Sequence, residues 1–474
     1  MATSQEYQKA RQTHWDNIAS CKEAGIRWGD YYHQRLTQIY QFLVAPGQKV
    51  IEIGCGTGDL LSALKPAPGV GIDFSGQMIK HARQKYREMK FIQCDAHDLD
   101  MGEKFDVIIL SDLVNDLWDV QTVFNQISKK LATPESRIII NTYSRLWEIP
   151  LKLAQQLGLM TSLLPQNWLT VEDVAGLLDM TDFEVIRHHS EILWPLHLPL
   201  LGDIINSFAA KLLPFRYFTL TNFIIARPRP VQLNKKPIVS VIVPARNEAG
   251  NISRIFETTP EMGQGTELVF VEGHSDDNTF SVIEKAVESH PDRKCKLLQQ
   301  TGVGKGDAVR LGFANADGEI LMILDADLTV PPEYLPRFYE ALVSGKGEFI
   351  NGVRLVYPME KQAMRYLNLI GNKFFSLAFS WLLGQPVKDT LCGTKVLWKS
   401  DYERIADNRA FFGDFDPFGD FDLLFGAAKL NLKIVEMPLR YAERTYGNTN
   451  IRRWSHGWLL LRMVMFAAGR IKFV

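Results

Sequence analysis

Two separate series of short apolar runs constrain the fold of this chain more than any other feature. The first series is KVIEIG, GVGID, KFIQCD, FDVIIL and RIIINT, and the second is VSVIVPA, TELVFVEG and GEILMILDAD. Helical patterns separate the runs, which is typical of a parallel sheet covered by helices. Between the two series, ARPRPVQLNKKP (Ala226–Pro237) breaks the periodicity with prolines and basic residues. We therefore expect two α/β domains, residues 1–228 and 238–474, joined by a linker at residues 229–237.

The length and the charge of the chain agree with this division. At 474 residues the chain is longer than one compact core usually is. A formal net charge of -1 gives no basic field for nucleic acid, so we expect no nucleic-acid partner. The five cysteines have no paired spacing, which argues against a disulfide framework or a zinc site and fits a reducing cytoplasm.

The apolar segments of the chain are too short to predict a membrane-spanning helix. The start, MATSQEYQKARQTHWDNIA, is polar and does not read as a signal peptide. Two stretches, Leu198–Leu213 and Trp458–Val474, are apolar enough either to pack within a domain or to touch a bilayer, the second as an amphipathic helix. We expect a cytoplasmic protein that can make peripheral contact with the cytoplasmic face of the inner membrane.

A glycine-rich turn follows the first strand of the first half. VIEIGCGTGDLL has glycines at positions 54, 56 and 58, which let the backbone pass close to a ligand. The dinucleotide fingerprint Gly-x-Gly-x-x-Gly is not met, because its sixth position is Asp59. Asp73 ends the next strand, where a carboxylate can accept hydrogen bonds from two ribose hydroxyls.

With these motifs, the stretch from Trp15 to Pro228 resembles the class I methyltransferases, which have a Rossmann-like sheet and use S-adenosylmethionine. The resemblance implies that Asp73 binds the ribose and that Asp95 and Ala96, in FIQCDAHDL, face the adenine ring. A lone acidic residue at a strand end can also be a helix cap, but three such positions in order favour the cofactor. The resemblance implies these cofactor-binding residues: Glu52, Gly54, Gly56, Gly58, Asp73, Asp95 and Ala96.

The methyl acceptor has a weaker signal in the sequence. SDLVNDLWD follows the fourth strand, where the family places groups near the transferred methyl, so Asp112 and Asn115 are candidates. Transfer to a hydroxyl needs a general base, for which the candidates are His188, His189 and His197. Each of these histidines can equally be an ordinary core or surface residue.

The second half has polar residues at the ends of two apolar strands. VSVIVPARNE leads into Arg246 and Glu248, and GEILMILDAD ends on Asp325 and Asp327. Two carboxylates one residue apart can bind Mg²⁺ or Mn²⁺, and such a cation neutralises a diphosphate leaving group. An acidic turn before PPE is the alternative interpretation.

From Pro237 onward the chain resembles the inverting family 2 glycosyltransferases, which have a GT-A nucleotide-sugar-binding sheet. It differs where relatives carry Asp-Asp-Gly-Ser, because this chain has Glu272-Gly273-His274-Ser275. The resemblance implies that Asp325 and Asp327 hold the metal and that Arg444 contacts the donor phosphates. The implied nucleotide-sugar-binding residues are Pro244, Arg246, Glu248, Glu272, Asp325, Asp327 and Arg444.

Within that family, the likeness is to polyprenyl-phosphate sugar transferases of the dolichyl-phosphate mannose synthase type. It implies that Arg354 and Arg365 bind the acceptor phosphate, for which the planar guanidinium is suited. Asp420 stands where many relatives keep a catalytic base, and Asp422 is the alternative. We expect Asp420, Asp327 and Arg444 to be the catalytic residues.

The two halves together predict a bifunctional enzyme of lipid-linked glycan or cell-envelope synthesis. One half would transfer a methyl group from S-adenosylmethionine, and the other would transfer a sugar from a GDP- or UDP-linked donor to a polyprenyl phosphate or glycan. One alternative is a soluble enzyme that decorates a small natural product. Another is a non-catalytic scaffold that binds nucleotide sugars.

Overall fold

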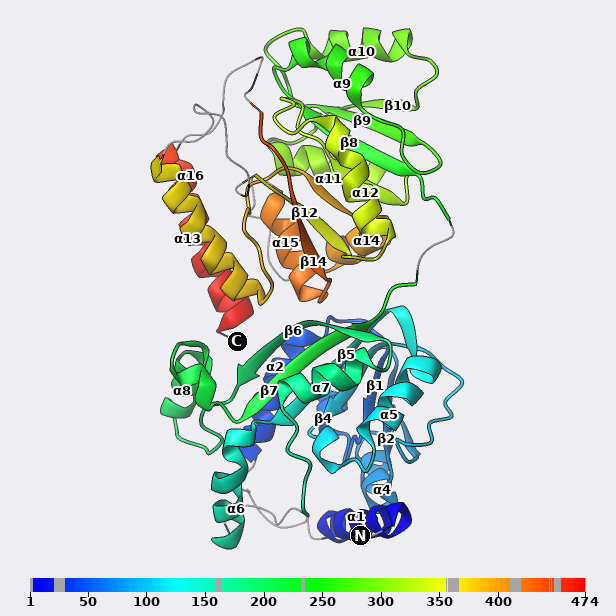
Figure 1. Ribbon diagram of the computed structural model, residues 1–474, viewed down its shortest axis with the longest axis vertical. Coiled ribbons are helices and arrows are strands. Elements are labelled where there is room, and N and C mark those ends of the chain that lie inside the picture. Colours follow the sequence, from blue (N-terminus) through cyan, green and yellow to red (C-terminus); the bar gives the residue numbers. More distant parts are fainter. Residues whose placement is uncertain are drawn as a thin grey trace. The chain divides into compact units, whose positions relative to one another are not determined.

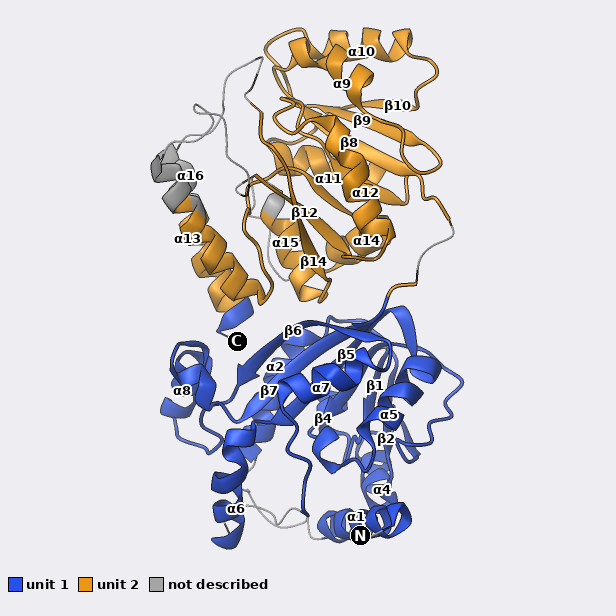
Figure 2. Cartoon of the chain, in the orientation of Figure 1, with its two compact units in different colours: residues 1–229, 471–474 blue, residues 230–470 orange. Residues whose placement is uncertain are grey.

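The computed structural model describes residues 3–20, 30–158, 164–231, 235–354, 356, 366–409, 419–442, 444, 446 and 453–473. The chain forms two compact units, which Figure 2 colours separately. Unit 1 comprises residues 1–229 with 471–474, and unit 2 comprises residues 230–470. Each unit is an α/β structure, as the alternating pattern predicts, and each contains a seven-stranded sheet.

The sheet of unit 1 has the strand order β3-β2-β1-β4-β5-β7-β6 (Figure 1). Strands β1 to β5 pair in parallel, whereas β7 pairs antiparallel with both β5 and β6. The order reverses between β1 and β4, and ligands of open α/β sheets bind beyond the strand ends at such a reversal. The strands are β1 (Val50–Ile53), β2 (Gly69–Asp73), β3 (Lys90–Gln93), β4 (Phe105–Ser111), β5 (Ala132–Tyr143), β6 (Phe183–Glu191) and β7 (Thr221–Pro228).

Helices cover both faces of this sheet. Alternate residues of β4 enter different cores, since Ile108 and Leu110 belong to one buried cluster and Val107 and Ile109 to another. A sheet buried on both faces explains why its strands are continuous apolar runs. The helices of unit 1 are α1 (Ser4–Ser20), α2 (Asp30–Leu43), α3 (Asp59–Leu64), α4 (Gly76–Lys85), α5 (Val120–Gln126), α6 (Glu148–Gln156), α7 (Val171–Asp179) and α8 (Leu201–Ser207).

Side-chain caps fix the starts of several of these helices. Ser75 Oγ accepts a hydrogen bond from the backbone N–H of Met78 at the start of α4. Thr170 and Asp173 form a reciprocal capping box at the start of α7. Such caps satisfy backbone donors that have no partner within the helix.

The sheet of unit 2 has the strand order β10-β9-β8-β11-β13-β12-β14, with β13 antiparallel to both of its neighbours. Its order reverses between β8 and β11, the two strands that carry the polar motifs. The strands are β8 (Val239–Ala245), β9 (Thr266–Glu272), β10 (Cys295–Gln299), β11 (Ile320–Ile323), β12 (Phe349–Val353), β13 (Lys395–Trp398) and β14 (Ile434–Pro438).

The helices of unit 2 pack closely on this sheet. On one face, α11 lies so near β8 that a Cβ at Gly312 would come 2.6 Å from Ile242 Cγ2. Figure 1 shows α13 and α16 side by side, and the two helices are in contact. The helices are α9 (Ile252–Thr258), α10 (Thr279–Ser289), α11 (Lys305–Asn315), α12 (Leu335–Val343), α13 (Tyr366–Leu383), α14 (Lys399–Asp407), α15 (Asp420–Lys429) and α16 (Arg453–Ala467).

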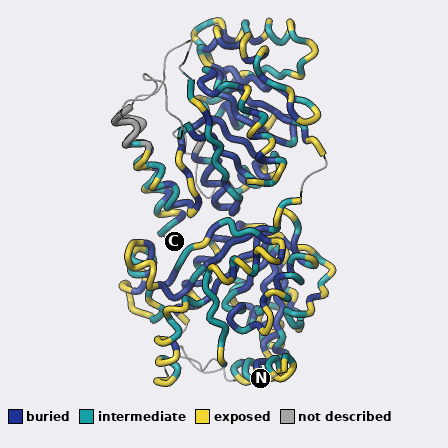
Figure 3. Tube along the Cα trace, in the orientation of Figure 1, coloured by how far each residue is buried: buried dark blue, intermediate teal, exposed yellow. Residues whose placement is uncertain are grey.

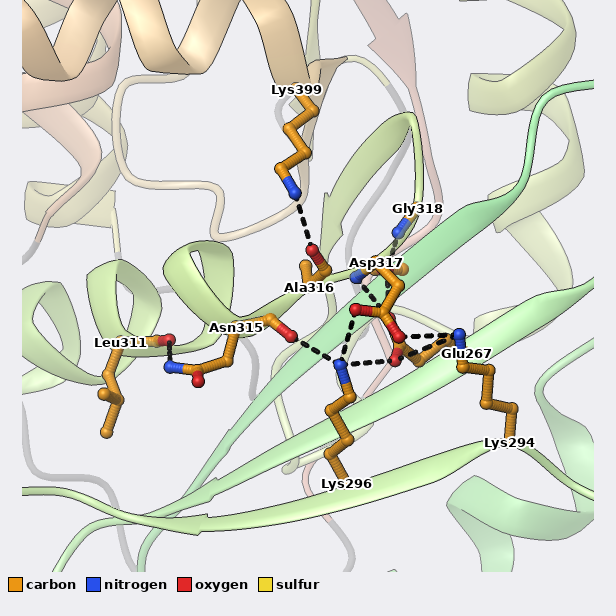
Figure 4. A network of polar contacts seen from close by, with 10 residues as sticks. Glu267, Lys294, Lys296, Leu311, Asn315, Ala316, Asp317, Gly318 and Lys399 are labelled. Carbon is orange, nitrogen blue, oxygen red and sulfur yellow. Dashed lines mark hydrogen bonds and ion pairs between the residues drawn. The ribbon is translucent and has the colours of Figure 1, made fainter.

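A network of charged groups joins the strands of unit 2 at their amino ends (Figure 4). The buried carboxylate of Glu267 accepts hydrogen bonds from the Ser240 hydroxyl and from the backbone N–H of Asp317. Lys294 and Lys296 lie 2.7 and 2.8 Å from the Asp317 carboxylate, and they hold the pKa of Asp317 well below its usual range. The polar ends of β8, β9 and β10 are therefore tied together at the edge opposite the site described below.

The sequence predicts an amphipathic C-terminal helix, but in α16 apolar side chains lie on both the buried and the exposed side. Leu460, Met463 and Ala467 are buried, whereas Trp458 and Met465 are more than half exposed. Among the described residues, no helix combines the length and the apolar character that are needed to span a bilayer.

Candidate active sites

The glycine turn after β1 is tightly packed in unit 1. Gly54, Gly56 and Gly58 have φ values of +75°, +51° and +78°. Residues other than glycine rarely adopt this backbone conformation. A Cβ at Gly54 would lie 2.8 Å from Leu113, and one at Gly58 would lie 2.6 Å from the Phe91 ring. A Cβ at Gly56 would meet no atom within 4 Å, so this glycine provides the turn rather than the packing.

Two buried carboxylates hold this turn. Asp73 accepts hydrogen bonds from the backbone N–H groups of Gly56 (2.9 Å) and Ser75 (2.8 Å). Glu52 accepts one from the N–H of Leu61 in α3 (3.0 Å), and burial raises the pKa of Glu52 well above its ordinary value. Asp73 also lies in the wall of the cavity described next. Glu52 is placed to anchor α3 behind the turn.

A cavity of about 1410 Å³ opens beside the glycine turn. Its wall includes the predicted cofactor residues Glu52, Gly54, Gly56, Asp73, Asp95 and Ala96. Asp95 accepts a hydrogen bond from the His97 backbone N–H at 2.8 Å, and the His97 ring at 2.7 Å lowers the pKa of Asp95. Ligand pockets typically measure roughly 300–1,000 Å³, so this cavity has room for more than one small ligand.

Asp112 is a half-buried carboxylate in the wall of the same cavity. It follows β4 with a φ of +52°, which is an uncommon conformation for a residue with a side chain. The Tyr32 hydroxyl donates to both of its carboxylate oxygens at 3.0 Å, and Asn141 Nδ2 donates to one of them at 2.6 Å. Burial raises the pKa of Asp112 to about 7. A carboxyl group of this kind can exchange a proton near neutral pH.

The other candidates for the methyl acceptor side lie elsewhere. Asn115 is buried, accepts a hydrogen bond from the Thr142 hydroxyl at 2.6 Å, and supports the structure behind the cavity. His189 stacks on Phe223, and burial lowers its pKa well below the ordinary value. His188 and His197 are exposed. The cavity wall contains His33, His81 and His97 instead of these three histidines.

In unit 2, an ion pair lies beyond the end of β11. Lys305 Nζ, at the start of α11, lies 2.6 Å from Asp325 Oδ1. Burial alone would raise the pKa of Asp325, but the Lys305 ammonium outweighs burial and lowers the pKa. A Cβ at Gly393 would come 2.1 Å from Asp325 Oδ2 and 2.4 Å from Lys305 Nζ. The glycine of DTLCGTK is therefore required for this carboxylate to take its position.

A second ion-pair cluster joins Asp327 to the end of β8. Arg444 Nη2 donates to Asp327 Oδ2 at 2.6 Å, while Arg444 Nη1 lies 3.3 Å from Glu248 Oε1. Asp327 Oδ1 also accepts a hydrogen bond from the Thr329 hydroxyl at 2.7 Å. Burial raises the pKa of Glu248, and Arg444 partly offsets this effect. Residues that the sequence assigns to one site thus meet across the switch between β8 and β11.

The ends of β8 and β9 form the adjoining wall. Pro244 is half-buried and Arg246 is exposed. The buried Glu272 accepts a hydrogen bond from the backbone N–H of Ser275 at 2.6 Å, so the segment that departs from the family pattern is held by its own carboxylate. The hydroxyl of Ser275 in turn accepts from the N–H of Asn247 at 3.0 Å.

Comparison with known families finds one match in each unit. Residues 45–179 match the family described as methyltransferase domain, and residues 240–405 match glycosyl transferase family 2. The chain joins a methyltransferase domain to a family 2 glycosyltransferase domain. Its fold class and its transferase character follow from these matches together with the two sheets.

Relatives of the glycosyltransferase domain act on lipid phosphates, as their names state. The chain is 33% identical over 219 residues to the dolichol-phosphate mannosyltransferase of Pyrococcus furiosus, covering 45% of this chain and 59% of that protein. It is 32% identical over 111 residues to the undecaprenyl-phosphate 4-deoxy-4-formamido-L-arabinose transferase of Proteus mirabilis, covering 23% of this chain and 34% of that protein. The chain thus spans less than two thirds of either relative.

A solved structure is similar to the methyltransferase domain. Magnesium protoporphyrin IX methyltransferase from Synechocystis PCC 6803 with bound SAH is 18% identical, with a TM-score of 0.34. The similarity covers 47% of this chain and 96% of that one.

Arg354, which the sequence predicts to bind the acceptor phosphate, is engaged within the protein. Its guanidinium donates in a fork to Asp389, with Nε at 2.8 Å from Oδ2 and Nη2 at 2.9 Å from Oδ1. Its positive charge also contributes to lowering the pKa of Asp325. Arg365, the other predicted phosphate ligand, lies outside the described residues.

The predicted base, Asp420, is the first residue of α15. A Cβ at the preceding Gly419 would lie 2.5 Å from the Cα of Gly306, so the start of α15 lies against the start of α11, next to Lys305. The side chain of Asp420 itself lies outside the described part of the structure. Asp422, the alternative, accepts a hydrogen bond from Arg409 Nε at 2.8 Å.

Sequence reasoning missed three residues that shape the two sites. Lys305 lies in GVGKGD, whose glycines and lysine resemble a phosphate-facing loop, and Gly393 lies in DTLCGTK. Both segments are recognisable in the sequence, but their contact with Asp325 is not. Tyr32 comes from α2 and has no motif beside it, so only the fold brings it to Asp112.

Proposed function

We propose that the chain is a bifunctional enzyme of lipid-linked glycan or cell-envelope synthesis. The glycosyltransferase domain transfers a sugar from a GDP- or UDP-linked donor to a polyprenyl phosphate or a glycan. The methyltransferase domain transfers a methyl group from S-adenosylmethionine to a related intermediate. The cluster of Asp325, Asp327, Arg444 and Lys305 at the switch between β8 and β11 is the observation that carries the proposal. Relatives named for dolichol phosphate and undecaprenyl phosphate support the acceptor class.

The donor site suits a divalent cation bound together with the diphosphate. Among the described residues, no group of three or more His, Cys, Asp or Glu side chains assembles a complete metal site. Mg²⁺ is commonly held by one or two carboxylates plus substrate phosphates and water, so Asp325 and Asp327 fit such a shared site. A bound Mg²⁺ or Mn²⁺ would neutralise charge on the leaving diphosphate.

The basic side chains of this site suit the donor phosphates. Arg444 and Lys305 now pair with Asp327 and Asp325. In the donor complex these cations would also face the phosphates, so that the leaving group is stabilised as its charge develops. The nucleotide and ribose would lie along the ends of β8 and β9, beside Pro244, Arg246, Glu248 and Glu272.

The acceptor decides whether a base is needed. An oxygen of a polyprenyl phosphate is already anionic, so it bonds to the anomeric carbon while the bond from that carbon to the diphosphate breaks, and the carbon is inverted. A glycan hydroxyl must also lose a proton, which Asp420 would accept. We propose that Arg354 and Arg365 bind the acceptor phosphate, with Asp389 orienting the Arg354 fork.

In the methyltransferase domain, we propose that Asp73 binds the ribose of S-adenosylmethionine and that Asp95 and Ala96 face its adenine. Glu52 and the three glycines would hold the turn against the cofactor. Asp112 would take the proton from the acceptor atom as that atom bonds to the methyl carbon and the carbon–sulfur bond breaks. Its position in the cavity wall and its bonds from Tyr32 and Asn141 support this role.

A donor panel tests the glycosyl transfer. The full-length chain is incubated with radiolabelled GDP- and UDP-sugars, Mg²⁺ or Mn²⁺, and undecaprenyl phosphate in detergent micelles. We expect one donor to give label in the organic extract and the Asp327→Asn variant to lose it. Transfer only to a soluble glycan would favour the Asp420 mechanism, whereas no turnover with any donor would refute the proposal.

Binding of S-adenosylmethionine tests the other half. Calorimetric titration should show one site, with an affinity that falls at least tenfold in Asp73→Asn and is unchanged in Asp327→Asn. Equal binding by wild type and Asp73→Asn would contradict the cofactor assignment. A peripheral position at the cytoplasmic face of the inner membrane completes the proposal.

A further inference from the structure

Large apolar side chains are exposed in two segments of unit 1. We call them the apolar face: Leu146, Ile149, Leu153 and Leu157 in and beside α6, and Leu198, Leu200, Leu201, Ile204, Leu212, Leu213, Phe215, Tyr217 and Phe218 in and around α8. Several are largely exposed, such as Leu200 at 82% and Ile149 at 71%. Figure 3 shows exposed residues along α6 and around α8. Large exposed apolar patches on a protein surface mark contact with a partner or a membrane.

Buried polar groups anchor the segment around α8 to the rest of unit 1. Asn206 of α8 is fully buried, and its Oδ1 accepts hydrogen bonds from the N–H groups of Leu193 and Trp194 at 2.8 and 2.9 Å. Lys211 is buried and forms an ion pair with the buried Glu191. In an ordinary amphipathic segment the apolar side chains face inward and the polar ones outward. Residues 198–218 place polar anchors inside and apolar side chains outside, which suits an apolar environment.

A further contact fixes α8 to the body of the domain. The Tyr31 hydroxyl of α2 donates to Asp203 Oδ1 at 2.9 Å, and Asn206 Nδ2 donates to that hydroxyl at 3.2 Å. A Cβ at Gly202 would lie only 3.0 Å from the same oxygen, so the helix is packed closely. The outward apolar side chains therefore belong to a well-anchored element.

The two parts of the apolar face meet at the cavity of the methyltransferase domain. Trp147 Nε1 donates to the carbonyl of Phe218 at 2.8 Å, and the N–H of Ser144 donates to the carbonyl of Leu220 at 2.7 Å. The cavity wall that contains the glycine turn also contains residues that neighbour both parts of the apolar face in the sequence: Trp147, Pro150, Leu151, Ala154, Trp194, Pro195, Leu196 and Leu220. The cavity is thus continuous from the cofactor residues to the base of the apolar face.

We infer that the apolar face lies on the surface of an anionic lipid bilayer and that the methyl acceptor enters the cavity from that bilayer. Exposed Arg145 and Arg216 lie among the apolar residues and favour anionic headgroups, whereas the exposed Lys152 forms an ion pair with Glu148 at 2.8 Å. An acceptor with an apolar tail would keep its tail against Leu151, Trp194 and Leu196 while its head reaches Asp112. The inference rests on the proposed function only in treating that acceptor as lipid-linked.

Vesicle flotation tests the inference with the full-length chain. The vesicles contain phosphatidylethanolamine and phosphatidylglycerol, and parallel samples contain phosphatidylcholine alone. Two double variants remove the apolar face, Leu200→Ser with Phe215→Ser and Ile149→Ser with Leu157→Ser. The matched control is Met180→Ser with Val231→Ser, two apolar side chains that are 61% and 81% exposed outside the face.

We expect wild type and the control to float with the phosphatidylglycerol vesicles. Each face variant should partition at least tenfold less, which corresponds to about 1.4 kcal/mol of binding free energy, because two large apolar side chains that would leave water on binding are removed. Weaker flotation of wild type with phosphatidylcholine alone is also expected. Equal flotation of face variants and control would overturn the inference.

Two further measurements keep the inference falsifiable. Hydrogen exchange with vesicles present should slow in residues 144–158 and 193–220, and slowing confined to α13 and α16 would place the contact elsewhere and overturn it. Sedimentation without lipid tests whether a second copy of the chain covers the apolar face instead of a bilayer. Dimers in wild type and monomers in the face variants would show an interface between copies and would overturn the inference. The S-adenosylmethionine titration and the donor panel, run on the same samples, separate a failure of this inference from a failure of the proposed function.

Discussion

The substitution Gly393→Ala is a sharp test of the proposed donor site, because it adds only a methyl group. The Cβ of Gly393→Ala would come 2.1 Å from Asp325 Oδ2, whereas ordinary contact begins at 3.4 Å. The carboxylate or the backbone must therefore move by the difference, about 1.3 Å. Lys305 Nζ would be 2.4 Å from the same methyl, so the ion-pair partner must move as well.

A displacement of about 1 Å in a catalytic group can lower the rate about 100-fold, which is about 2.7 kcal/mol of transition-state stabilisation. We expect Gly393→Ala to lower kcat/KM for sugar transfer by about this factor. Overpacking should cost about 1–3 kcal/mol of the free energy of unfolding, which leaves room for a folded variant. The assay measures initial rates with the donor that gives turnover, alongside a thermal melt.

The matched control is Gly371→Ala in α13, whose Cβ would meet no atom within 4 Å. It should retain wild-type sugar transfer, and both variants should bind S-adenosylmethionine as wild type does. If folded Gly393→Ala keeps more than half of the wild-type kcat/KM, the position of Asp325 does not limit the reaction and our description of the site is wrong.

Three further predictions concern the carboxylates and Arg444. The rate of methyl transfer should rise with pH through about 7 and level off above it, because Asp112 must lose its proton to act as a base. This rise should be absent in Asp112→Asn, and its persistence in that variant would exclude Asp112 as the base. Burial raises the pKa of Glu52 in the folded state, so wild type loses stability as pH rises above about 4.5. Glu52→Gln should therefore melt at a higher temperature than wild type at pH 7, with the difference shrinking toward pH 4.5, and a gap that is independent of pH would contradict this reasoning. Arg444→Lys should raise KM for the nucleotide sugar about tenfold, because a single ammonium cannot replace a fork that reaches both Asp327 and Glu248; unchanged initial-rate kinetics would count against its phosphate role.

Local sequence patterns were sufficient to predict two α/β domains and the strand ends that carry Asp73, Asp95 and Asp325, but they predicted only β8, β9 and β11 of the seven strands in the sheet of unit 2. Buried parallel strands are continuous apolar runs, and the glycine turn has a strict spacing, so both are visible in a single sequence. The antiparallel pairing of β7 and β13 was not predicted, since an apolar run has no direction.

Contacts between distant segments could not be predicted in the same way. The motif SDLVNDLWD contains three aspartates, and only the fold surrounds Asp112 with Tyr32 and Asn141. Likewise, nothing in the sequence near Arg354 shows that its guanidinium forks onto Asp389. These contacts decide protonation and orientation, which are the properties that a motif alone leaves open.

The polar residues at each of the two strand-order reversals come from one half of the chain. Asp73 and Asp112 belong to the reversal between β1 and β4, while Asp325 and Asp327 belong to that between β8 and β11. We therefore expect a substitution at one reversal and a substitution at the other to complement each other genetically. A cell that expresses one copy with Asp73→Asn and another with Asp325→Asn would regain both activities in trans, provided that the intermediate is released between the steps.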